Sequence, residues 1–251
     1  MKRYGTQYSG FFYPTGLPGL SSSSVLYCVG AGEDVSHDIE LAHATGAPVH
    51  IFDPTPRAIA HVDFVKKVLD SQTLVAPNRR FGGGDVNYWP LILEHSIPSS
   101  NILFHPYGLF TSDNPAMRFY MPTNPEYVSG SVVQGMKGES YIDVPVKSLR
   151  TIMRELGHTS IDLLKIDIEG CECDVLDLML DDGIFPRYLS VDFDLGWTGE
   201  KIQNRGRCHA TIERLMRAGY KMIHHDGADF SFQFISRGDI SPLTTPLTSQ
   251  T

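Results

Sequence analysis

The sequence predicts an α/β fold, in which a mostly parallel, doubly wound sheet ends in a C-terminal antiparallel hairpin. Short apolar runs alternate along the chain with segments of helical period, which is typical of strands joined by crossover helices. Residues 221–225 and 230–235 have the character of two strands separated by a short turn, so we expect them to pair antiparallel. With 251 residues, 41% of them hydrophobic, the chain is long enough for one such domain.

The first half of the chain supplies strands and helices in alternation. Residues 1–24 are rich in Gly, Tyr, Phe and Ser and show no helical period, so we expect an irregular N-terminal lead-in. Apolar runs predict strands at residues 25–29, 49–53 and 101–105. Helices are expected over residues 35–45, where Gly46 ends the helix, and from residues 54–56, whose prolines suit a first turn, to about residue 69. A polar, glycine-rich stretch over residues 71–100 follows.

The second half continues the alternation. Residues 107–134 mix short apolar groups with turn residues and predict a hairpin extension. Further strands are expected at residues 141–146, 162–168 and 187–193, and Pro145 favours an edge position for the first of them. Helices are expected at residues 148–156, after Gly170, and at residues 209–218. The chain is thus divided into a lead-in over residues 1–24, one domain over residues 25–238 and a flexible tail over residues 239–251.

Charge and composition exclude several partners. The 29 acidic residues outnumber the 21 basic ones, and a formal charge of −8 disfavours binding to a phosphate backbone. There is no run of about eighteen apolar residues, and the first residues lack the apolar core of a signal peptide. We therefore expect a cytoplasmic protein that acts on a small molecule or glycan, with no nucleic acid and no membrane as partner. Its cysteines are expected to be reduced structural thiols, at Cys28, Cys171, Cys173 and Cys208.

The turn after the first predicted strand has the context of a ligand-binding loop. It reads Val-Gly-Ala-Gly-Glu-Asp at residues 29–34, and Gly30 and Gly32 allow a ligand to approach the backbone closely. Asp53 ends the next strand, where a carboxylate can accept two hydrogen bonds from a ribose diol. The pattern therefore predicts a nucleoside pocket.

The residue that follows this loop helps to distinguish a dinucleotide from S-adenosylmethionine as the ligand. In a dinucleotide fingerprint a third glycine lets the helix pack near the pyrophosphate, but this chain has Val35 there. S-adenosylmethionine has no phosphate, and its amino-acid part needs backbone groups with polar partners such as Glu33 and Asp34. The loop therefore favours S-adenosylmethionine over NAD.

Carboxylates follow two strands that we expect to be neighbours in the sheet. Asp167 and Glu169 end one strand, and Asp192 and Asp194 end the next. Adjacent parallel strands lie about 4.8 Å apart, so these carboxylates can converge on one point. Three interpretations remain open. One is a general base for an acceptor hydroxyl, and another is an Mg²⁺ or Mn²⁺ site built from Asp167, Asp192 or Asp194. The third is structural, with Glu169 capping the helix and Asp167 accepting backbone hydrogen bonds.

Four segments resemble the FkbM family of S-adenosylmethionine-dependent methyltransferases, and the resemblance extends from about residue 3 to about residue 235. They are Leu-Leu-Lys-Ile-Asp-Ile-Glu-Gly at residues 163–170, the loop at residues 29–34, Ile-Phe-Asp-Pro-Thr-Pro at residues 51–56 and His-Pro-Tyr-Gly-Leu at residues 105–109. The resemblance implies the Rossmann-like fold of class I methyltransferases. It places the cofactor at Gly30, Ala31, Gly32, Glu33, Asp34, Asp53, Pro54, Tyr107, Gly108 and Asp167.

The family resemblance further implies O-methylation of hydroxyl groups on sugars or natural products. Residues 79–89 and 121–134 supply aromatic and hydrogen-bonding side chains that suit a carbohydrate, namely Tyr88, Trp89, Asn124, Tyr127, Ser129 and Ser131. We therefore expect an O-methyltransferase that acts on a sugar hydroxyl, such as a deoxyhexose in a glycan or glycosylated metabolite. The alternatives are an NAD-dependent oxidoreductase and a non-catalytic nucleoside-binding module.

Overall fold

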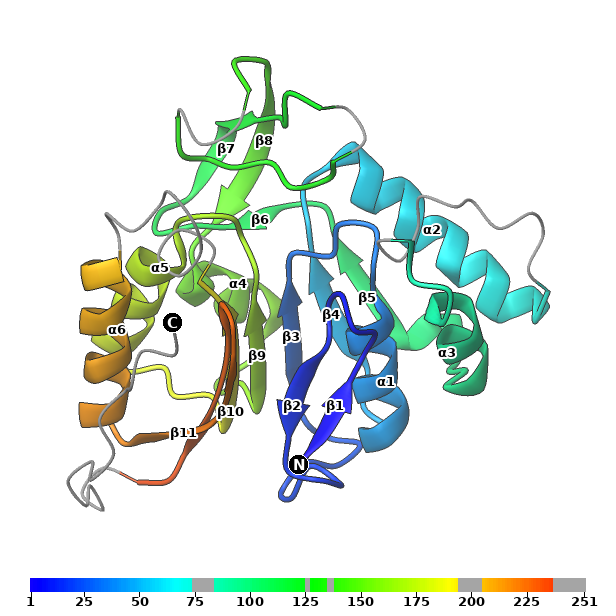
Figure 1. Cartoon of the computed structure of the whole chain (residues 1–251), viewed down its shortest axis with the longest axis horizontal. Helices are drawn as coiled ribbons and strands as arrows, with labels where there is room; N and C mark the ends of the chain where they lie inside the picture. Colours follow the sequence, from blue (N-terminus) through cyan, green and yellow to red (C-terminus); the bar gives the residue numbers. More distant parts are fainter. Residues whose placement is uncertain (74–83, 125–126, 135–137, 194–204, 237–251) are drawn as a thin grey trace.

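The fold is built on a seven-stranded, mostly parallel sheet, as predicted. The computed structural model describes residues 1–73, 84–124, 127–134, 138–193 and 205–236. The strands of this sheet are β3 (Leu26–Val29), β4 (Val49–Phe52), β5 (Ile102–His105), β9 (Leu163–Ile166), β10 (Tyr188–Asp192), β11 (Tyr220–Asp226) and β12 (Asp229–Phe234). Their order is β11-β12-β10-β9-β3-β4-β5, and β12 runs antiparallel to both neighbours, which forms the expected C-terminal hairpin (Figure 1).

The direction in which the chain adds strands reverses between β3 and β9. From β3 the chain adds β4 and β5 on one side, and it then returns to add β9 and β10 on the other. In open α/β sheets, ligands bind outside the carboxyl ends of the strands at such a reversal. The register pairs Val29 with Ile166, so Gly30 and Asp167 leave the sheet side by side. The topology thus brings two of the predicted site segments together.

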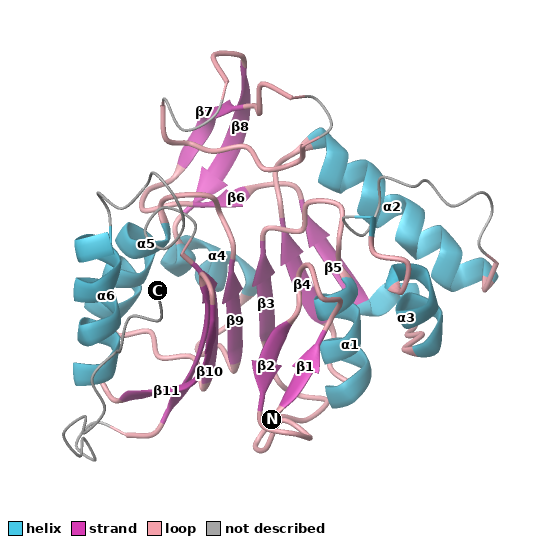
Figure 2. Cartoon of the chain, viewed as in Figure 1, coloured by secondary structure: helices cyan, strands magenta, loops and turns pink. Residues whose placement is uncertain are grey.

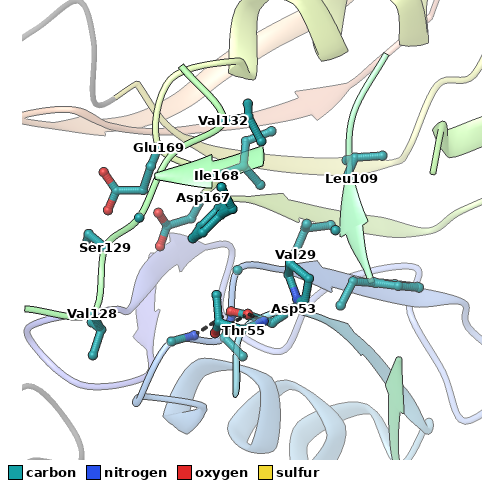
Figure 3. A pocket seen from close by; sticks show the side chains of 18 of the residues that line it. Val29, Asp53, Thr55, Leu109, Val128, Ser129, Val132, Asp167, Ile168 and Glu169 are labelled. Atoms are coloured by element: carbon teal, nitrogen blue, oxygen red, sulfur yellow. Dashed lines mark hydrogen bonds between the residues drawn. The ribbon is translucent and has the colours of Figure 1, made fainter. Parts of the chain in front are cut away.

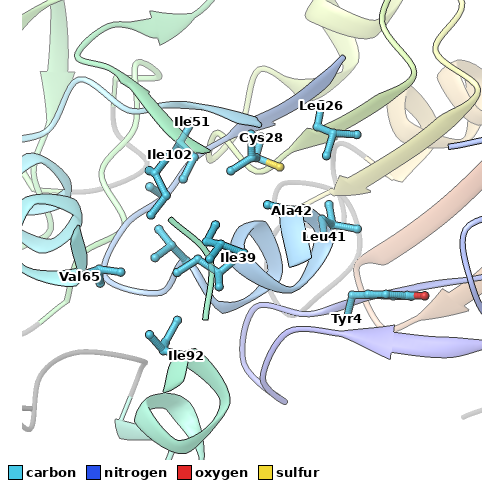
Figure 4. Packing of buried hydrophobic residues seen from close by; sticks show 14 of the residues in the cluster. Tyr4, Leu26, Cys28, Ile39, Leu41, Ala42, Ile51, Val65, Ile92 and Ile102 are labelled. Atoms are coloured by element: carbon cyan, nitrogen blue, oxygen red, sulfur yellow. The ribbon is translucent and has the colours of Figure 1, made fainter. Parts of the chain in front are cut away.

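Helices cover both faces of the sheet (Figure 1, Figure 2). One face carries α1 (Ser36–Thr45), α2 (Pro56–Ser71) and α3 (Tyr88–Glu94), and the other carries α4 (Leu149–Leu156), α5 (Glu172–Asp181) and α6 (Arg205–Arg217). Side chains alternate along β3, so Leu26 and Cys28 join the core under α1 (Figure 4), while Tyr27 and Val29 join the core under the second group. The result is a sheet buried on both faces.

Capping residues mark the helix ends where the sequence predicts them. Thr55 accepts a hydrogen bond from the first turn of α2, and Ser148 does the same for α4. Gly46 and Gly157 adopt left-handed conformations and end α1 and α4. The lengths of these helices are therefore encoded locally.

The lead-in at residues 1–24 is not irregular, which corrects the prediction. It contains β1 (Lys2–Tyr4) and β2 (Phe11–Tyr13), which pair antiparallel, and β2 lies against β11 and β12. Tyr4, Phe11 and Tyr13 are buried in the core shared with α1. The aromatic residues of this segment supply the apolar side of a hairpin that covers part of the sheet.

A second sheet of three strands lies beyond the carboxyl ends of the main strands (Figure 1), and we call it the lid sheet. It consists of β6 (Gly108–Leu109), β7 (Asn114–Tyr120) and β8 (Tyr141–Lys147) in the order β6-β8-β7. Of the hairpin predicted within residues 107–134 the structure shows one antiparallel bridge, between Tyr120 and Ser131, and β7 pairs mainly with β8. The predicted edge position of β8 is wrong. The register of β7 shifts opposite Pro145, and a bulge is one of the few places where a sheet tolerates proline.

The polar stretch at residues 71–100 holds α3 and a short 3-10 helix, Ser99–Asn101. Tyr88, Trp89 and Ile92 of α3 are buried, and their spacing is that of one face of a helix. The polar residues around them make this short apolar pattern hard to recognise in the sequence. No helix in the described ranges is long and apolar enough to cross a lipid bilayer. The predicted tail at residues 239–251 lies outside the described residues.

Candidate active site

An open cavity lies between the carboxyl ends of the central strands and the lid sheet (Figure 3). The empty space within it, part of which is open to solvent, measures about 850 Å³. One part of its wall is apolar and includes Phe52, Leu109 and Val146, while the turns after β3 and β9 supply backbone groups and carboxylates. Tyr8, from the lead-in, completes the wall. This mixed lining suits a nucleoside that carries a charged chain.

Most of the predicted cofactor residues line this cavity. They are Gly30, Ala31, Gly32, Glu33, Asp34, Asp53, Pro54, Gly108 and Asp167. Tyr107 is not among the lining residues. Its ring lies 5.7 Å from the Phe52 ring and 4.3 Å from the Lys147 ammonium, measured at the ring centroids. Tyr107 therefore supports the wall from behind.

The catalytic candidates are only partly brought together. Glu169 lines the cavity beside Asp167, but Asp192 does not, and Asp194 lies outside the described residues. Asp192 ends β10 directly opposite Asp229 of β12. Burial and the nearby Asp167 carboxylate raise the pKa of Asp229 to about 6.

Gly30 is the point at which the turns after β3 and β9 meet. Its φ is +85°, and a Cβ at this position would lie 1.8 Å from the carbonyl oxygen of Asp167. Any other residue would force the two strand ends apart. Glycine at this position therefore allows the loop at residues 29–34, which we call the cofactor loop after its predicted role, and Asp167 to share one end of the cavity.

The Asp53 carboxylate forms its hydrogen bonds with groups of the protein itself. One of its oxygens accepts hydrogen bonds from the backbone N–H groups of Ala31 (3.0 Å) and Gly32 (2.9 Å), and the other accepts from the Thr55 N–H (2.8 Å) and hydroxyl (2.6 Å). Burial raises the pKa of Asp53, and these four hydrogen bonds oppose the rise. The side chain that we expected to accept from a ribose diol thus braces the cofactor loop against the start of α2.

The two acidic residues of the loop also have partners. Both Glu33 oxygens accept hydrogen bonds from the Arg57 guanidinium, at 2.9 and 2.7 Å, and Arg57 also donates to the Tyr127 carbonyl at 3.0 Å. Asp34 accepts from the Thr6 hydroxyl at 2.7 Å and from the backbone of α1. These carboxylates therefore tie the loop to α2, to the lead-in and to the segment that follows β7.

Asp167 is the carboxylate best placed for chemistry. Its side chain is 32% exposed, and its Oδ2 accepts a hydrogen bond from the Lys165 ammonium at 3.2 Å. Within the described part of the chain, its Oδ1 accepts no hydrogen bond. Figure 3 shows the Asp167 and Glu169 carboxylates pointing to the same side, toward Ser129.

The backbone around Glu169 is strained. Glu169 has a φ of +60°, which a residue other than glycine rarely adopts, and the Ser131 hydroxyl donates to its carbonyl oxygen at 2.5 Å. The start of α5 is held by Glu172, whose Oε1 accepts from the Gly170 N–H at 2.7 Å. The strain turns the Glu169 side chain toward the cavity, and such strain is typical of functional sites.

Asp167 and Asp192, the two predicted metal ligands that the structure describes, are not part of a compact group of possible ligands. Among the described residues, the ligand atoms of Cys28, His37 and Asp38 are the ones that lie within 4.8 Å of one another. Asp167 and Asp192 belong to no such group. Cys28 of β3 and His37 and Asp38 of α1 are buried where this helix packs on the sheet, and none of them lines the cavity.

Several residues that line the cavity or hold its lining in place were not predicted from the sequence. Lys165 carries a charge inside an otherwise apolar strand, and that interruption was the available signal. Thr55 and Arg57 follow Asp53 closely, but only the fold shows that they hold acidic side chains. Conversely, Tyr88 and Trp89, which we expected to face a sugar, are packed in the core.

The comparison with known families agrees with this geometry. Residues 35–221, more than half of the chain, match the Methyltransferase FkbM domain. No curated protein and no solved structure matches the chain. The matched range contains β4, β9 and β10 with the strand ends that carry Asp53 and Asp167, and a methyltransferase of this family implies S-adenosylmethionine as the methyl donor. The chain belongs to the FkbM family of methyltransferases.

Proposed function

We propose that this methyltransferase transfers the methyl group to oxygen, and that its acceptor is a sugar hydroxyl. The observation that carries the proposal is the Asp167 carboxylate, which lines the cavity beside the cofactor loop with one oxygen held by Lys165 and the other unbonded within the described residues. An alcohol is a poor nucleophile while it keeps its proton, and a carboxylate within hydrogen-bond reach can take that proton.

Different residues of the cavity have different roles in methyl transfer. S-adenosylmethionine supplies an electrophilic methyl group when it is bound. Gly30 and Gly32 line the cavity without side chains, so the ligand can lie close to the backbone of their loop, and Asp53 keeps this loop in place. Asp167 Oδ1 accepts the proton of the acceptor hydroxyl and orients its oxygen. Since an in-line displacement needs little covalent help, holding the two reactants in line supplies much of the acceleration.

The acceptor side of the cavity supports a sugar. Glu169, Ser129 and Tyr8 present hydrogen-bonding groups there, while Phe119 and Val128 add apolar surface. Sugars need both, because their hydroxyl groups bond to polar atoms while their C–H groups pack on apolar side chains. A deoxyhexose, with an apolar methyl group beside its hydroxyl groups, matches this lining.

The first test is a panel of glycosides and free sugars incubated with S-adenosylmethionine that carries a labelled methyl group. We expect label in an alkali-stable methyl ether on one sugar, and label in an ester or on nitrogen would refute O-methylation of a hydroxyl. Asp167→Asn should bind S-adenosylhomocysteine normally and lose turnover by about 10²–10⁴-fold. Full turnover by Asp167→Asn would remove Asp167 as the base. Loss of turnover by the wild-type protein after chelation would favour a metal-assisted step.

A melting experiment separates this function from the oxidoreductase alternative. A ligand at one hundred times its dissociation constant adds about 2.7 kcal/mol, which corresponds to roughly 5–10 °C for a chain of this size. We expect such a shift with S-adenosylhomocysteine. A shift with NAD alone would overturn the proposal.

A further inference from the structure

Lys165 is a buried lysine in the middle of the central sheet. It is the third residue of β9, between Leu164 and Ile166, and only 3% of its side chain is exposed. Lysine is almost never fully buried without a partner, because an ammonium loses its hydration when it leaves water. The position therefore requires an explanation that the strand itself does not supply.

The Lys165 ammonium has two hydrogen-bond acceptors. It donates to the Gly30 carbonyl oxygen at 2.5 Å and to Asp167 Oδ2 at 3.2 Å. Burial lowers the pKa of Lys165, but the carboxylates of Asp167 and Asp38 outweigh burial and raise it above its ordinary value. Lys165 is therefore a charged donor at neutral pH.

The two acceptors belong to different halves of the site. Gly30 begins the cofactor loop, whereas Asp167 is the carboxylate on the acceptor side. Their strands are neighbours, with Cys28 paired to Lys165 in the register, so one side chain reaches both strand ends. Without Lys165 the Asp167 carboxylate, which is 32% exposed, would be free to change rotamer.

We propose that Lys165 is a positioning residue, which holds the Asp167 carboxylate at a fixed distance from the cofactor loop by bonding to both. The proposal rests on the function proposed above for Asp167. It assigns Lys165 a role in setting the distance between the methyl donor and the base, and not in proton transfer itself.

Lys165 could instead serve to neutralise a buried carboxylate of α1. Asp38 of α1 is 2% exposed, and its charge also acts on Lys165. Lys165 would then serve only to neutralise Asp38. The cluster of Cys28, His37 and Asp38 does not call for a metal ion instead, because the neighbouring ammonium would repel a divalent cation.

Two variants separate these roles. Lys165→Met keeps the length of the side chain and removes its charge, and the double variant Lys165→Met/Asp38→Asn also removes the buried carboxylate that would be left unpaired. Ser190→Ala is the matched control. Ser190 is fully buried and lies next to Lys165 in the register of β10, but its hydroxyl bonds to Ser231 and not to the site.

The measurements are the melting temperature, hydrogen exchange of the segments at residues 29–34 and 166–170, and the affinity for S-adenosylhomocysteine. We expect the double variant to recover the melting temperature that Lys165→Met loses. In both variants the two segments should still exchange faster, and the affinity should fall by about tenfold. With the sugar acceptor found in the panel, kcat should fall more than KM changes. Ser190→Ala should resemble the wild type in every readout.

Recovery of both local exchange and affinity in the double variant would overturn the proposal, because it would show that Lys165 only neutralises Asp38. Unchanged exchange at residues 29–34 and 166–170 in Lys165→Met would also overturn it. Failure of the wild-type protein to bind S-adenosylhomocysteine would refute the proposed function instead, and the exchange measurement would still decide whether Lys165 holds the two strand ends.

Discussion

Asp53→Asn tests whether the buried carboxylate braces the cofactor loop or binds a ribose. The Asp53 carboxylate accepts two hydrogen bonds at each oxygen. In the variant an NH₂ group replaces one oxygen. The Thr55 hydroxyl can turn and accept from this group, but the Thr55 N–H loses its acceptor. A buried backbone donor without a partner costs about 1–3 kcal/mol, and the two loop bonds lose about 1 kcal/mol each when the charge is removed.

The burial of one charge is avoided in the variant, which offsets part of this loss. We therefore expect the free energy of unfolding to fall by about 2–4 kcal/mol, and the melting temperature by roughly 5–15 °C. Urea unfolding and calorimetry measure these changes. A smaller loss than about 1 kcal/mol would show that the four hydrogen bonds contribute little.

Ligand binding distinguishes the two roles of Asp53 directly. A brace acts on the whole loop, so Asp53→Asn should weaken adenosine and 2′,3′-dideoxyadenosine by the same factor, about tenfold. Thr55→Val is the control, because it removes one bond to Asp53 and the cap of α2 but leaves both loop bonds in place. Weaker binding of adenosine with no change for the dideoxynucleoside would refute the reasoning and assign Asp53 to the ribose.

Three further changes test other parts of the site by urea unfolding. Gly30→Ala should lower the free energy of unfolding by about 2–4 kcal/mol, because its Cβ would lie 1.8 Å from the Asp167 carbonyl oxygen at a φ of +85°. Burial raises the pKa of Glu172 to about 8, above about 4.3 in the unfolded chain, so its contribution to stability is lost as pH rises between these values. Glu172→Gln should therefore be more stable than the wild type by about 1–3 kcal/mol at pH 7 and equal to it at pH 4. Arg57→Met should lose about 1–2 kcal/mol, because Glu33 is 8% exposed and loses its partner, and Glu33→Gln in the same chain should restore most of this.

Each of these changes has an outcome that contradicts it. Wild-type stability of Gly30→Ala would mean that the two strand ends are not in contact. A constant difference between Glu172→Gln and the wild type from pH 4 to pH 8 would show that Glu172 titrates as an exposed residue does. Additive losses in the Arg57 and Glu33 double variant would show that the two side chains do not interact.

The sequence predicts the central sheet well because its signals are local. Buried parallel strands appear as short apolar runs, and caps such as Thr55 and Gly46 mark the helix ends. The lid sheet was predicted poorly, because its pairing joins β7 to a strand about twenty residues away. In the sequence Pro145 indicates a strand at the edge of a sheet. Only the pairing with β7 reveals the bulge that accommodates this proline inside the lid sheet.

The site was predictable as a set of positions but not as a set of contacts. Nine of the ten predicted cofactor positions line one cavity, because the carboxyl ends of parallel strands meet at one edge of the sheet. Which carboxylates are already hydrogen-bonded depends on side-chain contacts that only the fold shows. Asp53 and Glu33 look equally available in the sequence, yet Thr55 and Arg57 occupy them. Burial of Lys165 likewise follows from the sheet and not from its neighbours in the chain.

The hairpin of the lead-in has a practical consequence for work with this protein. The family match begins at residue 35, yet Tyr8 and residues 29–34 form part of the cavity wall, and the Thr6 hydroxyl holds Asp34. A protein trimmed to the matched range would lack β3, which lies between β9 and β4 in the interior of the sheet, and would lose part of the cavity. An affinity tag next to β1 would adjoin a packed segment, since Tyr4 and Phe11 are buried in the core. The functional unit is therefore longer than the segment by which the family is recognised.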